Sequence, residues 1–414
     1  MSRTSAATGR AAGQVEATGS PGLMLALATI GFAVNFWAWA LISPLGPLFR
    51  DAGTLGTLTE SDVALMVAVP VVVGSLGRIP VGALTDRYGG RVMFPAVSFA
   101  TIVPVLFIGY LGHSSLAALL IGGFFLGIGG TAFAVGVPFV NAWFPPQRRG
   151  LAIGLFGAGM GGTAISALTT VKLIKAHGVP SPFLITAIVL AAYGGLTLLV
   201  LRDAPGRQAP TASLVQRLGG VLRLSLTWQA SALYALVFGG YVAFSVYLPT
   251  YLKTAYGLTQ ADAANRMAGF VLFAVVMRPI GGWLSDRFAA TRVVTALLVV
   301  VAAGAAVQAT TPALAPVGTI AFLAMAAALG TGSGAVFALV AQRAPAGTVG
   351  SVTGVVGAAG GLGGFVPPLV MGSLYGHFSN YGIGLVLLAG VALAALVFTV
   401  RVVARPAPVP VPAG

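Results

Sequence analysis

The stretch RIPVGALTDRY at residues 78–88 has a second version, RPIGGWLSDRF, at residues 278–288, which lies 200 positions further along the chain. In both versions an arginine comes eight residues before an Asp-Arg-aromatic triplet. A set of small residues repeats with the same offset: Gly150, Gly154, Gly157 and Ala158 match Gly350, Gly354, Gly357 and Ala358. Two copies of one long unit predict a chain built from two related halves.

The composition is that of a membrane protein. Of the 414 residues, 57% are apolar and 7% are charged, whereas soluble domains carry about 25% charged residues. The mean hydropathy of +0.96 agrees. This composition excludes a soluble globular enzyme. A membrane helix needs about 20 residues, so twelve with short connections need roughly 300 to 350, and the chain has no room for a large soluble domain.

The apolar runs predict an all-α integral membrane protein with twelve transmembrane helices in two pseudo-symmetric six-helix bundles. The predicted helices are 23–49, 62–84, 92–112, 115–144, 150–171, 182–201, 229–252, 266–285, 292–310, 316–341, 350–371 and 382–403. The bundles are 23–201 and 229–403, with a disordered tail at 1–22, a linker at 202–228 and a second tail at 404–414. A signal peptide is the alternative for the N-terminus, but the first apolar run is long enough to span.

The linker contains a short apolar pattern. Leu214, Leu218, Val221 and Leu222 fall on one side of a helix, with Gln216, Arg217 and Arg223 elsewhere. A helix on the inner membrane surface and an ordinary connection both fit this pattern.

The basic residues predict the topology. The net charge is +14, which in a soluble protein would suggest nucleic acid. With the N-terminus in the cytoplasm, fifteen Lys and Arg residues fall in cytoplasmic segments and five in outer segments. The positive-inside rule then places both termini in the cytoplasm, where basic loops meet anionic lipid headgroups. We therefore expect a multi-pass protein of the cell membrane that binds no nucleic acid.

The sequence calls for no metal and no cofactor. It contains no cysteine, so thiolate ligands are excluded. Its three histidines, His113, His177 and His377, fall in predicted loops.

The two remaining cations are Arg78 and Arg278, which lie inside predicted helices 2 and 8. Each is eight residues from an aspartate at its helix end, or about 12 Å in depth, which is close to the membrane midplane. The eight acids all fall in tails, loops or helix ends: Glu16, Asp51, Glu60, Asp62, Asp86, Asp203, Asp262 and Asp286. A central arginine costs roughly 2.5–3.5 kcal/mol even on insertion scales. We therefore expect an anionic cargo to supply the missing charge.

Two alternatives need no anion. The arginines could donate to backbone carbonyls, or their side chains could snorkel toward the membrane surface. The planar fork of an arginine suits a small planar oxyanion such as nitrate, nitrite or a carboxylate. The predicted core has no Asp, Glu or His for a proton relay. Anion exchange needs no relay, whereas proton symport would route the proton through water or the bound anion.

The segment Asp86–Arg91 resembles the loop signature of the major facilitator superfamily. We expect a carboxylate at the helix end, Asp86 and in the second copy Asp286, to face basic residues and to latch the two halves in one state. The basic residues of the signature are Arg87, Arg91 and Arg287. A solvated turn is the alternative.

Three glycine-rich stretches carry a more specific resemblance. They are GIGGTAFAVGVPFVNAWFPP at 127–146, GLAIGLFGAGMGGT at 150–163 and TGVVGAAGGLGGFVPP at 353–368. They resemble helices 4, 5 and 11 of the nitrate/nitrite porter family of the major facilitator superfamily, and the resemblance covers about residues 23 to 400. Small residues let membrane helices approach closely, so helices 5 and 11 should cross helices 8 and 2.

The resemblance implies an anion held between Arg78 and Arg278. It places Tyr234 and Phe238, one turn apart on helix 7, and Phe133 on helix 4 around the same site. Gly157 and Gly357 are expected to line the cavity, where a bare backbone leaves room for a small ion.

Two positions depart from the family pattern. Met160 stands where many members carry an anion-contacting asparagine, and Ser333 replaces a comparable asparagine in helix 10. These changes weaken the assignment to nitrate and leave the arginine pair intact.

The expected function is secondary active transport of nitrate, nitrite or both by alternating access, with a proton or a counter-anion as possible coupling partner. The protein is expected to be a monomer and not an enzyme. Another small anion, such as cyanate, formate or another monocarboxylate, is the alternative. A membrane-embedded enzyme or sensor is a third, although the core offers no titratable acid or base beyond tyrosines.

Overall fold

The computed structural model describes residues 19–45, 48–49, 53, 55, 58, 60–207 and 211–404. The statements below concern these residues. Most of the predicted tail at 1–22, the tail after Ala404 and residues 46 and 47 of the first predicted helix lie outside them. Pro21 and Gly22 are described and already belong to the first helix, so that part of the predicted disordered tail is wrong.

The N-terminal half consists of α1 (Pro21–Trp39), α3 (Glu60–Tyr88), α4 (Gly90–Tyr110), α5 (Leu116–Leu126), α6 (Ala132–Trp143), α7 (Arg149–Gly157), α8 (Gly162–His177) and α9 (Pro180–Val200). Short 3₁₀ turns join some of these helices into longer segments. The turn η2 (Gly127–Thr131) joins α5 to α6, and η4 (Ala158–Gly161) joins α7 to α8.

The linker and the C-terminal half consist of α10 (Leu214–Leu222), α11 (Ser225–Tyr256), α12 (Gln260–Arg287), α13 (Ala290–Ala309), α14 (Thr319–Arg343), α15 (Val349–Gly363), α16 (Val366–Phe378) and α17 (Gly382–Phe398). The described residues contain no β-strand. The predicted all-α membrane fold is confirmed. Ten described helical segments are long and apolar enough to cross a membrane, and the bent pair α10–α11 brings the number to eleven. The predicted helix at 350–371 corresponds to two shorter helices, α15 and α16.

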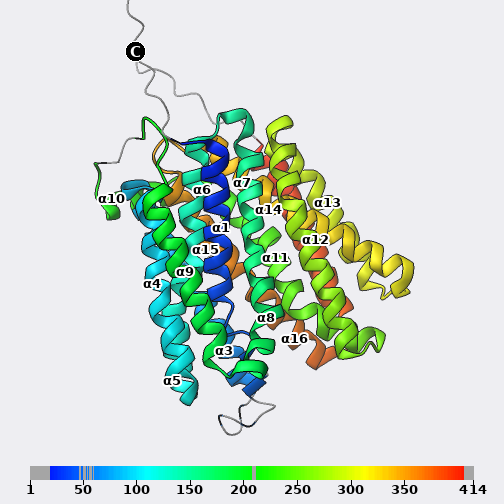
Figure 1. Cartoon of the computed structure of the whole chain (residues 1–414). Helices are drawn as coiled ribbons and strands as arrows, with labels where there is room; N and C mark the ends of the chain where they lie inside the picture. The colour runs from blue at the N-terminus through cyan, green and yellow to red at the C-terminus, as the bar shows by residue number, and fades with distance from the viewer. Residues whose placement is uncertain are drawn as a thin grey trace, which may run out of the picture.

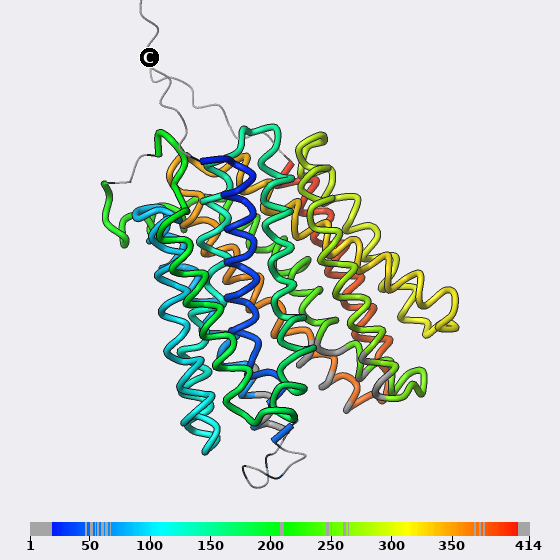
Figure 2. Tube along the Cα trace, viewed as in Figure 1, coloured from blue at the N-terminus to red at the C-terminus, as the bar shows by residue number. Residues whose placement is uncertain are grey.

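The two halves lie side by side (Figures 1 and 2), with α4, α5 and α9 on one flank and α12 and α13 on the other. The start of α1, the linker helix α10 and the end of the described chain lie at the same end of the bundle. We call this the linker end. Asp86 and Asp286 also lie there, since each belongs to the last turn of its helix.

Several predicted boundaries are wrong for local reasons. The helix at 23–49 ends at Trp39, because the backbone tightens into i→i−3 hydrogen bonds from Leu41 and Ser43 before Pro44. Asp86, Arg87 and Tyr88 belong to α3 and not to a loop, and the turn into α4 consists of Gly89 at φ +83°. His177 and His377 lie at the ends of α8 and α16, not in loops.

The linker helix begins with a capping box formed by Ser213 and Gln216. Its buried residues are Arg217 and Val221, which lie four positions apart and therefore on one face. Leu222 is 42% exposed. The predicted separation of an apolar face from the side that carries Arg217 is therefore wrong, because α10 packs its Arg217 face onto the protein.

Glycines bring the predicted helix pairs into backbone contact. An added Cβ at Gly82 of α3 would collide with the carbonyl of Gly350 on α15, and one at Gly282 of α12 would collide with the carbonyl of Gly150 on α7. The expected crossing of helices 5 and 11 with helices 8 and 2 is confirmed. Both crossings lie at the linker end.

We predict that Gly282→Val lowers the thermal unfolding temperature of the purified protein. Overpacking a tight contact costs about 1–3 kcal/mol, and the backbone of α7 cannot move aside cheaply. The matched control is Gly390→Val on α17, where nothing lies within 4 Å of an added Cβ. Equal unfolding temperatures for the two variants would contradict the close crossing.

Candidate anion-binding site

Arg78 projects from the middle of α3 and is 2% exposed. Its Nε donates to the carbonyl of Gly130 at 3.0 Å, and its Nη1 donates to the carbonyl of Gly357 at 2.8 Å. Gly130 belongs to the 3₁₀ turn η2 of the same half, and Gly357 belongs to α15 of the other half. The backbone-carbonyl alternative therefore describes Arg78 in this state, and its guanidinium bridges the two halves.

Arg278 occupies the equivalent place on α12 and is 4% exposed. Its Nη2 donates to the hydroxyl of Tyr234 at 3.2 Å, and its Nη1 contacts the sulfur of Met160. Its Nε is buried and has no hydrogen-bond partner among the described residues. Sulfur is a weak acceptor, so Arg278 is less well satisfied than Arg78 and retains donor capacity for an anion.

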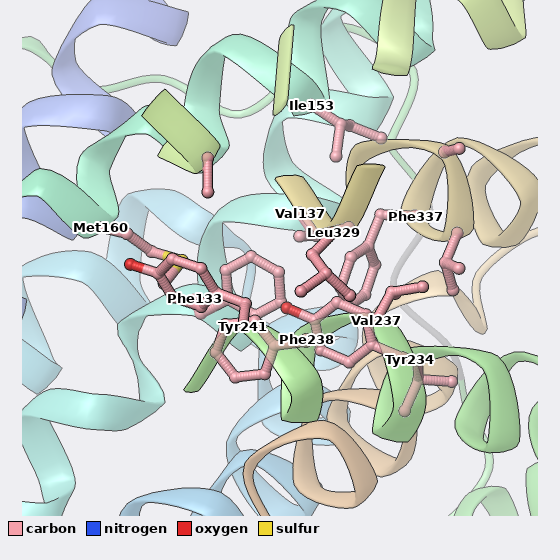
Figure 3. Close-up of a cluster of buried hydrophobic side chains, with 14 of the residues drawn as sticks. Phe133, Val137, Ile153, Met160, Tyr234, Val237, Phe238, Tyr241, Leu329 and Phe337 are labelled. Carbon is pink, nitrogen blue, oxygen red and sulfur yellow. The ribbon is translucent and has the colours of Figure 1, made fainter. Parts of the chain in front are cut away.

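Aromatic rings surround the two cations. Phe133 and Tyr234 are nearly parallel, at 4° with centroids 6.5 Å apart, and Tyr234 and Phe238 are also stacked, at 5° and 4.8 Å. The Cζ atom of Arg78 lies 5.7 Å from the ring of Phe133, and that of Arg278 lies 5.7 Å from the ring of Phe238. Each ring thus offers a cation–π contact to one arginine. Figure 3 shows these rings clustered with Met160.

Two aromatic residues of this cluster were missed by the sequence reading. Phe337 of α14 packs edge-on against Phe133 and Tyr234, with centroid distances of 4.8 and 4.5 Å. Tyr241 stacks on Phe238 at 5.9 Å. The available signal was helical spacing, since Phe337 comes four residues after Ser333 and Tyr241 comes three after Phe238.

The glycines next to the arginines leave room for the guanidinium groups. An added Cβ at Gly157 would lie 3.1 Å from Nε of Arg278, and one at Gly357 would lie 3.1 Å from Cδ of Arg78. Ser333 is buried, but its hydroxyl donates to the carbonyl of Leu329 at 2.8 Å within its own helix. The residues expected around the anion therefore converge on one place, while the Ser333 hydroxyl is already engaged.

No carboxylate reaches this site within the described part of the chain. The hydrogen bonds of Arg78 and Arg278 go to carbonyls, a hydroxyl and a thioether. The described residues also contain no group of three His, Cys, Asp or Glu side chains that could hold a metal ion. Two buried cations without counter-charge are costly, and this arrangement favours a bound anion.

The aspartates of the two repeats bind helix N-termini across the interface between the halves. Asp286 of α12 accepts from the backbone N–H groups of Gly150 and Leu151 at 2.8 and 2.7 Å, in the first turn of α7. Asp86 of α3 accepts from those of Gly350 and Ser351 at 2.8 Å each, in the first turn of α15. A helix N-terminus favours a carboxylate through its free N–H groups and its dipole. We call these two contacts the latches.

Asp86 does face a basic residue, Arg217 of the linker helix, but within the described residues neither aspartate forms an ion pair with Arg87, Arg91 or Arg287. The guanidinium of Arg87 lies over the ring of Tyr88, 5.4 Å from its centroid, and that of Arg287 lies over Trp283 at 4.6 Å. Arg91 contributes its backbone N–H to Asp203 at 3.2 Å. The guanidinium groups of Arg87 and Arg287 thus lie over aromatic rings of their own helices, while helix N-termini supply donors to the two carboxylates.

Comparison with known proteins defines the class. The family model of the Major Facilitator Superfamily matches residues 28–368 and, in a second match, residues 233–414. The crystal structure of the human organic anion transporter MFSD10 (TETRAN) superposes with a TM-score of 0.75 at 16% identity, covering 92% of this chain and 100% of that one. The fold is therefore that of a major facilitator transporter, and the protein is not an enzyme.

Two relatives narrow the class to a family. The "Probable nitrate/nitrite transporter NarK2" of Mycobacterium tuberculosis (strain ATCC 25618 / H37Rv) is 49% identical over 382 residues, which cover 91% of this chain and 95% of the relative. The "Nitrite extrusion protein" of Bacillus subtilis (strain 168) is 34% identical over 384 residues, covering 91% and 93%. The chain belongs to the nitrate/nitrite porter family of the major facilitator superfamily.

We predict that Asp286→Asn opens the linker end. The neutral amide keeps one acceptor oxygen and replaces the other with an NH2 group, so one hydrogen bond is lost and the other no longer goes to a charged acceptor; a hydrogen bond to a charged group contributes about 1.5–3 kcal/mol. Spin labels at Val92 of α4 and Ala289, before α13, should report a longer distance in a larger share of molecules. Asp262→Asn is the control, because Asp262 is exposed in the first turn of α12. Unchanged distances in Asp286→Asn would show that this latch does not hold the halves together.

Proposed function

We propose that this protein is a secondary active transporter of nitrate, nitrite or both, and that the anion is held between Arg78 and Arg278. The observation that carries the proposal is the pair of buried guanidinium groups without a carboxylate, one of which has an unpartnered Nε. The printed names of the two relatives above support the same cargo. A small planar oxyanion can accept from both forks at once.

The hydrogen bonds of Arg78 suggest how the site tolerates an absent anion. The carbonyls of Gly130 and Gly357 satisfy two of its N–H groups, so its charge is solvated by the backbone. Arg278 lacks carbonyl partners and depends more on the cargo. Binding of an anion would draw Arg78 away from the carbonyl of Gly357, and that exchange would change a contact between the halves.

The two latches at equivalent places in the two halves support a transport cycle by alternating access. Both lie at the linker end, which we assign to the cytoplasmic side from the distribution of basic residues. With both latches formed, the cytoplasmic side is closed. Their release would open the site to the cytoplasm, in a monomer with both termini inside. A counter-anion or a proton would then complete the cycle.

Met160 supports a second candidate cargo. Its sulfur contacts Arg278 in a place where many family members offer an amide. Thioether sulfur is soft and donates no hydrogen bond. The second candidate cargo is cyanate, formate or another monocarboxylate, because Met160 offers no amide to nitrate.

The decisive test is transport in liposomes. Arg78→Ala and Arg278→Ala should each abolish the flux of labelled nitrate and nitrite, because each removes half of the positive charge at the site. Arg266→Ala is the control, since Arg266 is exposed near the start of α12. Wild-type flux in both site variants would overturn the two-arginine site. Flux blocked by excess formate and unaffected by nitrate and nitrite would select the alternative cargo.

We further predict that Met160→Asn lowers the KM for nitrate about tenfold. One hydrogen bond to a charged group contributes about 1.5 kcal/mol, and 1.4 kcal/mol corresponds to a factor of ten. Met160→Leu keeps the volume, provides no donor and should leave the KM near that of the parent. If both variants give the same KM, the side chain at this position does not contact the anion.

A further inference from the structure

Arg217 is a linker residue with an unusually complete set of partners. It belongs to α10 and is 8% exposed. It donates to the carbonyl of Ala83 at 2.8 Å, to Oδ2 of Asp86 at 2.6 Å, to Oγ of Ser351 at 3.0 Å and, more weakly, to the carbonyl of Gly347 at 3.4 Å. The partners come from both halves, because Ala83 and Asp86 belong to α3, whereas Gly347 and Ser351 belong to the start of the segment that contains α15. One side chain thus joins the linker to both halves.

The position of Arg217 is set by the fold of the linker. Val221, one turn further along α10, is buried with it. The hydroxyl of Thr227 donates to the carbonyl of Val221 at 2.7 Å, and Nε1 of Trp228 donates to the carbonyl of Leu222 at 2.7 Å. These bonds fix the 74° bend between α10 and α11. The seating of Arg217 is therefore coupled to the first turn of α11, the helix that carries Tyr234.

The two latches differ in two donors, Arg217 and the hydroxyl of Ser351. Asp286 accepts two backbone N–H groups. Asp86 accepts the two equivalent groups, the hydroxyl of Ser351 at 2.7 Å and the guanidinium of Arg217. Both side chains of the Asp86–Arg217 ion pair are almost fully buried, at 4% and 6% exposure. Removing one partner of such a pair leaves a buried charge without compensation, which is strongly destabilising.

We propose that Arg217 is a positioning residue of the transport cycle, which holds the linker end closed by fixing Asp86 against the N-terminus of α15. Arg217 must release Ser351 or Asp86 before α3 and α15 can separate there. The linker end can then open only after α10 has moved away from α3 and α15. The linker stabilises the latch of Asp86 and not that of Asp286. The inference rests on the alternating access proposed above but is independent of which anion is carried.

Distance measurements between spin labels test this inference, since the chain has no cysteine of its own. One pair, Val92 and Ala289, reports the linker end, and a second pair, Ser114 and Thr310, reports the opposite end. In the full-length protein in nanodiscs, Arg217→Ala should lower the ratio of closed to open molecules at the linker end about tenfold or more. Arg223→Ala, which removes an exposed arginine just after α10, should leave both distributions unchanged.

Two further variants separate positioning from a general loss of structure. Arg217→Lys keeps the charge but not the planar set of donors, so it should restore part of the closed population. In an Asp86→Asn background, Arg217→Ala should add much less than it does alone, because residues that act through one contact are not additive.

The proposal is overturned if folded Arg217→Ala or Arg217→Lys protein gives the parent distance distributions. It is also overturned if Arg217→Ala has its full effect in the Asp86→Asn background. Should Arg217→Ala fail to fold, the Arg217→Lys distributions decide. None of these distance measurements requires nitrate. Their outcome is therefore independent of the two-arginine site, which is tested by the flux of the Arg78 and Arg278 variants.

Discussion

The structure depends on two positive charges held where a membrane protein can least accommodate them. Arg78 and Arg278 are buried in symmetry-related helices, and their partners among the described residues are carbonyls, a hydroxyl and a sulfur. Glycines on α7 and α15 leave room for the guanidinium groups, and parallel rings cover them. These features do not neutralise the charge. On the function proposed above, an anion would complete the site on binding and restore the unbalanced state on leaving.

The same two helix pairs connect this site to the linker end of the molecule. On α3, Arg78 donates to the carbonyl of Gly357 and Asp86 accepts from the N–H of Gly350, so both contacts are made with α15. On α12, Arg278 lies against Gly157 and Asp286 accepts from Gly150, so both face α7. A shift of either arginine toward an anion thus acts on the helix that the nearby latch holds. Arg217 and the hydroxyl of Ser351 make the two latches unequal, because both donate only to Asp86.

The sequence predicted the fold and the residues that converge at the centre because those depend on repeated, local signals. Hydropathy located the spans, the offset of 200 residues revealed the halves, and the glycine spacing predicted the crossings. The partners of the aspartates could not be predicted from the motif, because α15 and α7 approach only in the folded chain. Arg217 was assigned to the polar side of its helix for the same reason: a helical pattern does not reveal a buried carboxylate on another helix. Phe337 became part of the site only through the packing of α14 against α6 and α11.

Compensation of the two buried arginines by a bound anion is tested most directly by thermal unfolding. The melting temperature of the purified protein is measured as a function of nitrate concentration. Gluconate is the balancing anion that keeps the ionic strength constant. A ligand that binds the native state stabilises it by RT ln(1 + [L]/Kd). If an anion compensates the arginines, the melting temperature rises with nitrate or nitrite and does not rise with gluconate. A melting temperature that is the same in all three anions would contradict it.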